Sequence, residues 1–303
     1  MALQSRAEAP PVAWLSRAVQ KDTLYAPMPS KRPTSRTPGP GRPKPKPGPR
    51  RRKPPLRLFT TTLWEYPSQH YDDERGGIQG DKRYTGATPS WVIWQLLSRY
   101  TREKDLVVDP MCGSGTTLDV ARDLGRRALG YDLASPRDDV FRADARELPL
   151  EDGVADFVFV DPPYSTHVEY SDDPRCVGKL DAGGDDGGAA YYQAMETVIG
   201  ECHRVMKDRR YLGLYVSDSF RKGRPFMPIG FELFALLRER FRPVDIIAVV
   251  RRNAKLRRGN WHKAAEEGNY FLRGFNYLFI MKKEEAARPG TAQARGRSRS
   301  SRK

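Results

Sequence analysis

The chain has 303 residues, of which 53 are Lys or Arg and 38 are Asp or Glu, giving a formal net charge of +15. Its 38% hydrophobic and 30% charged content is typical of a globular protein, and apolar runs such as 275–281 are far shorter than the roughly 20 residues of a membrane-spanning helix. We expect no secretory signal, because no basic start followed by an apolar stretch is present. The three cysteines, Cys112, Cys176 and Cys202, are too scattered for a disulfide framework or a CxxC metal site, which predicts a reducing compartment and no bound metal.

Most of the positive charge lies at the two ends of the chain. Residues 31–57 contain 11 Lys or Arg, 9 Pro and no acidic residue, and residues 287–303 contain 6 unopposed basic residues. With +1 for residues 1–30, these ends carry +18, so residues 58–286 carry −3. Such ends bury too little apolar surface to offset the entropy of ordering them. We therefore predict disordered tails at 1–57 and 287–303 around one domain, the tails being either solvated linkers or electrostatic arms for nucleic-acid phosphates.

Between the tails, apolar runs alternate with segments of helical periodicity. Strands are expected at 106–108, 128–131, 140–143, 156–160, 211–216, 243–250 and 275–281, and helices at 90–100, 116–124, 191–206 and 231–240. This alternation predicts an α/β domain with a mostly parallel sheet. The aromatic-rich segment 60–71 fits either core packing or the lining of a pocket entrance. Residues 165–190 are rich in Gly and Asp, which predicts a mobile loop that orders on substrate binding.

A glycine-rich turn, DPMCGSGTT at 109–117, joins the first long strand to a helix. Gly113 and Gly115 have no Cβ, so the backbone can turn tightly and a ligand can approach its N–H groups. Alone, this pattern fits a structural turn as well as a cofactor loop. Asp132, at the end of the next strand, strengthens the cofactor interpretation, because an acidic residue there can bind ribose hydroxyls. The turn lacks the spacing and the lysine of a phosphate-binding P-loop.

A second turn, Asp161-Pro162-Pro163-Tyr164, follows an apolar strand. The two prolines remove two backbone donors and stiffen the chain, which directs the Asp161 carboxylate and the Pro162 carbonyl outward. Both groups are acceptors that suit an exocyclic amino group, and Tyr164 offers a flat face for a planar base. The structural alternative is an ordinary turn whose tyrosine packs in the core.

A basic segment with an aromatic residue follows the strand at 243–250. Its expected nucleic-acid contacts are Arg251, Arg252, Lys255, Arg257, Arg258, Trp261 and Lys263. Clustered Lys and Arg next to an aromatic ring are typical of a loop that contacts a nucleic-acid backbone. A solvated charged loop is the alternative interpretation.

The two turns, DPMCGSGTT and then FVFVDPPY, together resemble the S-adenosylmethionine-dependent N6-adenine/N4-cytosine DNA methyltransferase family. The resemblance extends over about residues 58–283. It implies a Rossmann-like, mostly parallel sheet of seven strands with helices on both faces and an antiparallel final strand. S-adenosylmethionine is the implied cofactor.

The resemblance also implies a role for each matching position. Asp161, Pro162, Pro163 and Tyr164 would be catalytic. Asp132 would bind the ribose hydroxyls and Asp144 the adenine amino group of the cofactor. The remaining cofactor-binding positions would be Asp109, Met111, Cys112, Gly113 and Gly115 of the glycine loop, together with Thr88 and Pro89 of a segment that closes over the methionine carboxylate.

These observations predict a methyltransferase that modifies an exocyclic amine of DNA, most simply adenine N6 and otherwise cytosine N4. A base inside a duplex would have to be flipped out to reach such a site. Two alternatives stay open: an RNA enzyme that methylates guanine N2 or adenine N6, and a non-catalytic nucleic-acid-binding protein with the same fold. No separate target-recognition region is apparent. The expected partner is nucleic acid and not a membrane, and the expected location is the cytoplasm, with the nucleoid if DNA is the substrate.

Overall fold

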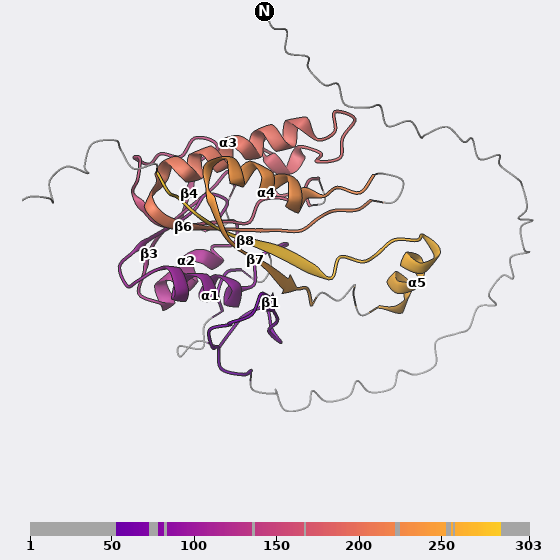
Figure 1. The fold of residues 1–303 in the computed structure, drawn as a ribbon, viewed down its shortest axis with the longest axis horizontal. Helices are drawn as coiled ribbons and strands as arrows, with labels where there is room; N and C mark the ends of the chain where they lie inside the picture. The colour runs from indigo at the N-terminus through magenta and orange to yellow at the C-terminus, as the bar shows by residue number, and fades with distance from the viewer. Residues whose placement is uncertain are drawn as a thin grey trace, which may run out of the picture. The chain divides into compact units, whose positions relative to one another are not determined.

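The computed structural model describes residues 53–72, 78–81, 84–134, 137–166, 168–221, 225–252, 256 and 258–285. In chain order these form β1 (Leu63–Trp64), α1 (Ser90–Tyr100), β2 (Leu106–Asp109), α2 (Thr116–Asp123), β3 (Arg127–Asp132), β4 (Val140–Arg142), β5 (Ala155–Val160), the 3-10 helix η1 (Val177–Lys179), α3 (Ala189–Val205), β6 (Met206–Val216), α4 (Ile229–Arg240), β7 (Arg242–Val250), α5 (Gly259–Glu267) and β8 (Phe275–Lys282). The strands make one sheet in the order β1-β7-β8-β6-β5-β2-β3-β4 (Figure 1). Strand β8 is antiparallel to β6 and β7, and the other pairs are parallel.

The sheet is covered on both faces, as Figure 1 shows, with α3 and α4 on one side and α1 and α2 on the other. The α3 and α4 side contains the larger apolar cluster, and α1 packs over the second cluster, which includes Trp91, Leu96 and Phe157. Every residue of β5 is buried, as expected for a central strand of a parallel sheet, whose two faces both pack against helices. The predicted Rossmann-like α/β class with an antiparallel final strand is confirmed.

The sheet has eight strands, one more than expected. The additional strand is β1, whose two residues pair with Ala248 and Val249 of β7. It lies in the aromatic-rich segment 60–71, and the side chains of Trp64, Tyr66 and Tyr71 are buried in the cluster beneath α1. Core packing is thus the interpretation that holds for these three rings. A two-residue strand has no periodicity of its own, so only its pairing with a distant strand reveals it.

The domain begins earlier than residue 58. The Pro54 carbonyl accepts a hydrogen bond from the Tyr66 hydroxyl at 2.7 Å, and the Arg57 carbonyl accepts one from Gln95 Nε2 at 2.6 Å. The prediction of a disordered tail is therefore wrong for residues 53–57. Their backbone carbonyls accept hydrogen bonds from the domain, and Leu56 packs against its second apolar cluster. The rest of that tail, residue 286 and the C-terminal tail predicted at 287–303 lie outside the described residues. Among the residues that the structure describes, no helix is long and apolar enough to cross a membrane.

The strand order reverses between β2 and β5. From β2 the chain continues to β3 and β4 on one side, whereas β5 pairs with the other side of β2 and leads on to β6. In open α/β sheets a crevice forms at the carboxyl ends of the strands where this reversal occurs. The glycine turn follows β2 and the Asp161 turn follows β5, so both sequence motifs lie at this crevice.

Candidate active site

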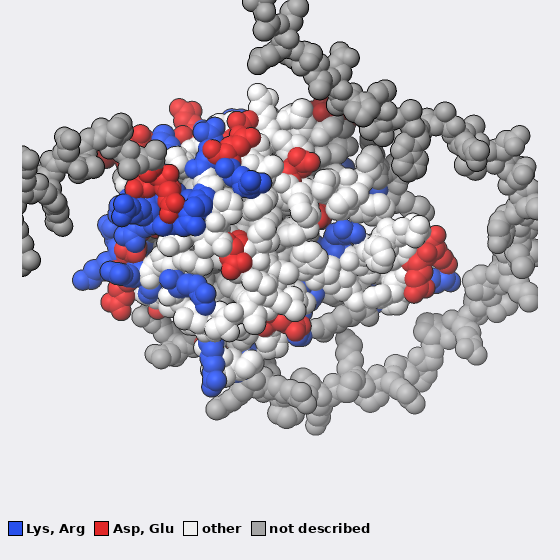
Figure 2. All heavy atoms as spheres, in the orientation of Figure 1, with Lys and Arg blue, Asp and Glu red and all other residues white. Residues whose placement is uncertain are grey.

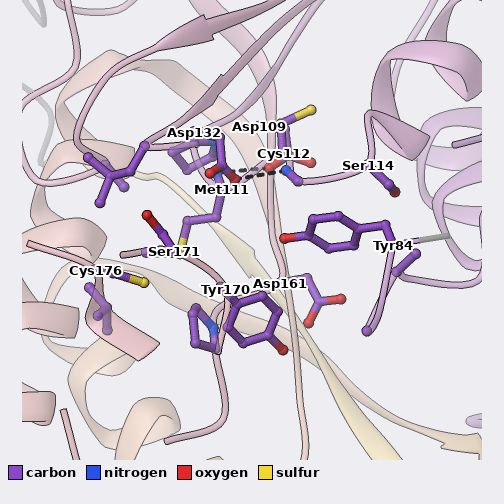
Figure 3. Close-up of a pocket in the computed structure, with 18 of the residues that line it drawn as sticks. Tyr84, Asp109, Met111, Cys112, Ser114, Asp132, Asp161, Tyr170, Ser171 and Cys176 are labelled. Carbon is purple, nitrogen blue, oxygen red and sulfur yellow. Dashed lines mark hydrogen bonds between the residues drawn. The ribbon is translucent and has the colours of Figure 1, made fainter. Parts of the chain in front are cut away.

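A cavity of about 840 Å³ lies at the carboxyl ends of β2, β3 and β5 (Figure 3). Nine residues that the sequence predicted as functional line it: Thr88, Asp109, Met111, Cys112, Gly113, Asp132, Asp144, Asp161 and Pro163. Four predicted residues are not among its lining: Pro89, Gly115, Pro162 and Tyr164.

The Asp109 carboxylate holds the glycine turn from beneath. It is only 4% exposed, and it accepts hydrogen bonds from Thr117 Oγ1 at 2.5 Å and from the Met111 amide at 3.1 Å. Burial raises the pKa of Asp109 to about 7, against the opposing effect of these two hydrogen bonds. Both bonds lie within the turn, so this side chain stabilises the turn and already has a donor on each of its two oxygens.

The positions of Gly113 and Gly115 require glycine. Gly113 has φ of +47° and Gly115 has φ of +75°, both in the left-handed region that favours glycine. A Cβ on Gly113 would also come within 2.7 Å of the Tyr84 ring. Gly115 is the N-cap of α2 and acts by allowing the turn to enter the helix, which explains its absence from the cavity lining.

Asp132, at the end of β3, lies across the cavity from Asp161 (Figure 3). Its Oδ2 accepts a hydrogen bond from the Gly113 amide at 2.9 Å, and its Oδ1 accepts one from the Ala134 amide at 3.0 Å. Each carboxylate oxygen has two lone-pair sites, so capacity for further donors remains on both oxygens. These bonds fix the carboxylate at the cavity wall, where two neighbouring hydroxyl groups could donate to it.

Asp144 lies at the cavity in a short turn after β4. Arg146 donates to it from the backbone amide, from Nε at 3.0 Å and from Nη2 at 2.7 Å. Burial alone would raise the pKa of Asp144, but the Arg146 hydrogen bonds and charge outweigh burial and lower it. Asp144 therefore stays ionised, with its remaining lone pairs as the acceptors available to an amino group.

Asp161, the first residue after β5, is half-buried and accepts two hydroxyl donors. Thr88 Oγ1, just before α1, donates to Oδ2, and the Tyr164 hydroxyl donates to Oδ1 at 2.7 Å. Burial raises the pKa of Asp161 to about 7, although both hydrogen bonds and the charge of Arg251 act in the opposite direction. Tyr164 thus contacts Asp161 through its hydroxyl group, and its ring packs beside the core under α3.

Two tyrosines in the cavity were missed by the sequence analysis. Tyr84 projects into the cavity between the loop that carries Cys112 and the Asp161 carboxylate (Figure 3), and its ring centroid lies 6.3 Å from that of Tyr170. Burial raises the pKa of both hydroxyl groups, that of Tyr170 to about 12, so both remain protonated donors at neutral pH. The only sequence signal was their position, one beside the predicted closing segment and the other in the insert.

The insert after the Asp161 turn forms one wall of the cavity, through Tyr170, Ser171, Arg175, Cys176 and Val177. It is tied to the turn by Ser165, whose hydroxyl donates to Asp181 at 3.0 Å and accepts from the Ala182 amide at 3.0 Å. Within the described residues, no cluster of His, Cys, Asp and Glu could hold a metal ion.

The residues of the basic segment have different surroundings. Arg251 is half-buried and donates to Ser217 Oγ at 3.2 Å, whereas Arg252 is exposed and pairs with Glu65 at 2.6 Å. Arg258 is exposed at the start of α5. On α5, Trp261 is half-buried, and Lys263 is exposed and lies 3.6 Å from Glu267. The predicted contacts Lys255 and Arg257 lie outside the described residues.

Figure 2 shows how charge is distributed on one face of the part of the chain that the structure describes. On the face shown in Figure 2, the Lys and Arg side chains of the described residues are interspersed with Asp and Glu. This mixture agrees with the small net charge of the central region. A polyanion could therefore bind at local clusters of basic side chains.

Comparison with known proteins identifies a family whose model matches this chain. The model of the N6_N4_Mtase family, described as DNA methylase, matches residues 20–137 and 155–300. Among curated proteins, the chain is similar to the type II methyltransferase M.MthZI of Methanothermobacter thermautotrophicus, with 29% identity over 87 residues, 26% of this chain and 24% of that protein. It is also similar to the type II methyltransferase M1.MboII of Moraxella bovis, with 31% identity over 71 residues, 23% of this chain and 27% of that protein. The chain thus matches only about a quarter of the length of these relatives.

Solved structures include TrmN from Thermus thermophilus, which has 17% identity and a TM-score of 0.42 and is matched over 66% of this chain and 50% of that one. The family model is matched over well over half of the chain, and its match includes both the glycine turn and the Asp161 turn. The chain therefore belongs to the N6/N4 DNA methylase family.

Proposed function

We propose that the protein transfers a methyl group from S-adenosylmethionine to an exocyclic amino group of a DNA base, adenine N6 or cytosine N4. One observation carries the proposal: Asp161, an acceptor suited to an amine, and the glycine turn with Asp132, suited to a nucleoside cofactor, line the same cavity. The membership of the N6/N4 DNA methylase family supports DNA as the substrate. A DNA substrate would place the protein in the cytoplasm with the nucleoid.

The cavity fits S-adenosylmethionine in the chemistry of its donors and acceptors. Asp132 presents acceptors for a ribose diol, and Asp144 presents acceptors for an adenine amino group. Met111, Leu133 and Val177 also line the cavity and supply apolar surface for a flat ring. When bound, S-adenosylmethionine supplies an electrophilic methyl group on a sulfonium centre.

The residues of the chain have to position the amine. The nitrogen of adenine N6 or cytosine N4 is a poor nucleophile, because its lone pair is delocalised into the ring. We expect the Asp161 carboxylate to accept an N–H bond of this amine, which fixes the nitrogen and favours a pyramidal form with an available lone pair. Orientation of this kind supplies a large part of the acceleration in such reactions. Asp161 is the stronger acceptor while it is ionised, because protonation turns one of its two oxygens into a donor.

The rate of transfer should therefore depend on pH near neutrality. Because burial raises the pKa of Asp161 to about 7, the carboxylate is protonated at lower pH and its proton blocks an acceptor position. We expect kcat/KM to fall roughly tenfold per pH unit below pH 7 and to level off above it. The measurement is kcat/KM between pH 5.5 and 9, with thermal unfolding at each pH as the control for folding. A flat profile from pH 5.5 to 8 would contradict the role of Asp161.

The function is tested by incubating the protein with methyl-labelled S-adenosylmethionine and, separately, genomic DNA or total RNA. The labelled nucleoside is then identified after digestion. N6-methyladenine or N4-methylcytosine from DNA supports the proposal, whereas label in RNA alone favours the RNA methyltransferase alternative. If the cofactor binds and neither polymer is labelled, the protein is not the proposed enzyme, and the non-catalytic nucleic-acid-binding alternative gains support.

A further inference from the structure

A row of polar side chains crosses the sheet from the Asp161 turn to the basic segment. In the sheet register Val160 pairs with Leu214, which places Asp161 beside Tyr215 of β6. Ser217 follows Tyr215 by two residues and so faces the same side. On the next strands Asn276 pairs with Val249, and Arg251 follows Val249 by two residues. Register thus places Asp161 and Arg251 on the same face, the one that α1 and α2 cover.

The middle of this row is buried and internally bonded. Tyr215 is 4% exposed, Ser217 1% and Asn276 6%. The Asn276 side chain is hydrogen-bonded to Tyr215, and Ser217 Oγ accepts a hydrogen bond from Arg251 Nη1 at 3.2 Å. The Arg251 backbone amide donates to the Gly274 carbonyl at 2.9 Å, which fixes the base of the arginine side chain. The guanidinium of Arg251 is therefore held against the polar row by contacts at both ends.

The charge of Arg251 acts on Asp161 through this buried region. Burial is the main influence on the pKa of Asp161 and raises it, whereas the positive charge of Arg251 lowers it. The same charge lowers the pKa of Tyr215, which Asp161 raises, so both charged groups act on that hydroxyl. The other polar groups that contact or influence Asp161 are Thr88, Asp109 and the tyrosines at 84, 164, 170 and 191, none of which is a cation.

We infer that Arg251 is a positioning residue that favours the ionised form of the Asp161 carboxylate, the form that accepts the amine, and that it does not contact a DNA phosphate. The inference rests on the proposed function and changes the role that the sequence predicted for this residue. Arg258 provides the contrast within the same segment: it is exposed just before α5, as a phosphate contact must be. Phosphate contacts position a protein on DNA and make its affinity fall at high salt, whereas Arg251 is half-buried and bonded to Ser217.

The test compares Arg251→Gln with Arg258→Gln in two measurements. The first is the pH profile of kcat/KM, and the second is the slope of DNA affinity against salt concentration. The acidic limb is the part of the profile in which kcat/KM falls as the pH is lowered. We expect Arg251→Gln to move this limb upward by roughly 0.5–1 pH unit and to leave the salt slope unchanged. We expect Arg258→Gln to leave the limb in place and to reduce the salt slope by about 1. Arg251→Lys, which retains the charge, should keep the limb near that of the wild-type protein.

A salt slope reduced by about 1 in Arg251→Gln, with an unmoved limb, would show a phosphate contact and overturn the inference. A measurement without DNA separates this result from failure of the proposed function. Arg251→Gln should lower the unfolding temperature more at pH 8, where Asp161 is charged, than at pH 5.5, where it is neutral. This difference should disappear in an Asp161→Asn background, and its persistence there would also overturn the inference.

Discussion

Asp161→Asn is expected to lower the rate of methyl transfer by roughly 10²–10³-fold, the range seen when one preorganised polar group is removed from an active site. The amide has nearly the same shape as the carboxylate but only one acceptor oxygen. Its NH2 group would face one of the two hydroxyl donors, Thr88 or Tyr164, or the amine of the base. The base could still enter the cavity, but its nitrogen would lose the charged acceptor that orients it.

The affinity for S-adenosylmethionine should remain close to that of the wild-type protein in this variant, because the proposed cofactor acceptors lie on other strands. Single-turnover transfer and calorimetric binding measure the two properties separately. Glu239→Gln, the same chemical change at an exposed position of α4, is the matched control and should retain transfer. Because burial disfavours the Asp161 charge, the asparagine variant should be at least as stable as wild type above pH 7. Full transfer activity in Asp161→Asn would exclude the proposed catalytic role.

Asp132→Ala is expected to raise the Kd for S-adenosylmethionine by roughly 10²-fold. Hydrogen bonds to a charged group contribute about 1.5–3 kcal/mol, and the upper part of this range corresponds to such a change in Kd. The variant also removes the acceptor of the Gly113 amide, which loosens the turn beneath the cofactor. Asp132→Asn retains one oxygen for that amide, so its Kd should lie between those of alanine and wild type.

Asp138→Ala is the control for this variant, because Asp138 is an exposed aspartate in the same connection between β3 and β4. Its Kd should match that of wild type. With saturating cofactor, kcat of Asp132→Ala should recover to within several-fold of wild type, since Asp132 does not contact the amine in the proposed arrangement. An unchanged Kd in Asp132→Ala would mean that the ribose is held elsewhere.

The sequence predicted the parts of the fold whose signals are local. The buried strand β5 is an uninterrupted apolar run, and the turn after β2 needs glycine at Gly113 and Gly115 for its left-handed backbone. The 3-10 helix η1 and helix α5 were not predicted. Helix α5 contains no buried residue, so it lacks the apolar stripe from which a helix is recognised.

The candidate site was predictable where a motif marks the end of a strand and was not predictable where side chains come from loops. Tyr84 and Tyr170 reach the cavity from separate loops, and no spacing relates them. Arg251 and Arg252 are neighbours of one residue type in one basic segment, yet one binds Ser217 beside the active site and the other pairs with Glu65. Strand register decides which of the two faces inward, and register depends on pairing between distant segments.

The two hydroxyl groups that donate to Asp161 determine when its carboxylate becomes ordered. Thr88 and Tyr164 fix the carboxylate from two sides. A hydroxyl group rotates about one bond, so either donor can yield its place to an arriving N–H while the carboxylate stays where it is. The entropic cost of immobilising the acceptor is thus met during folding. When the base binds, only the base itself still has to be ordered.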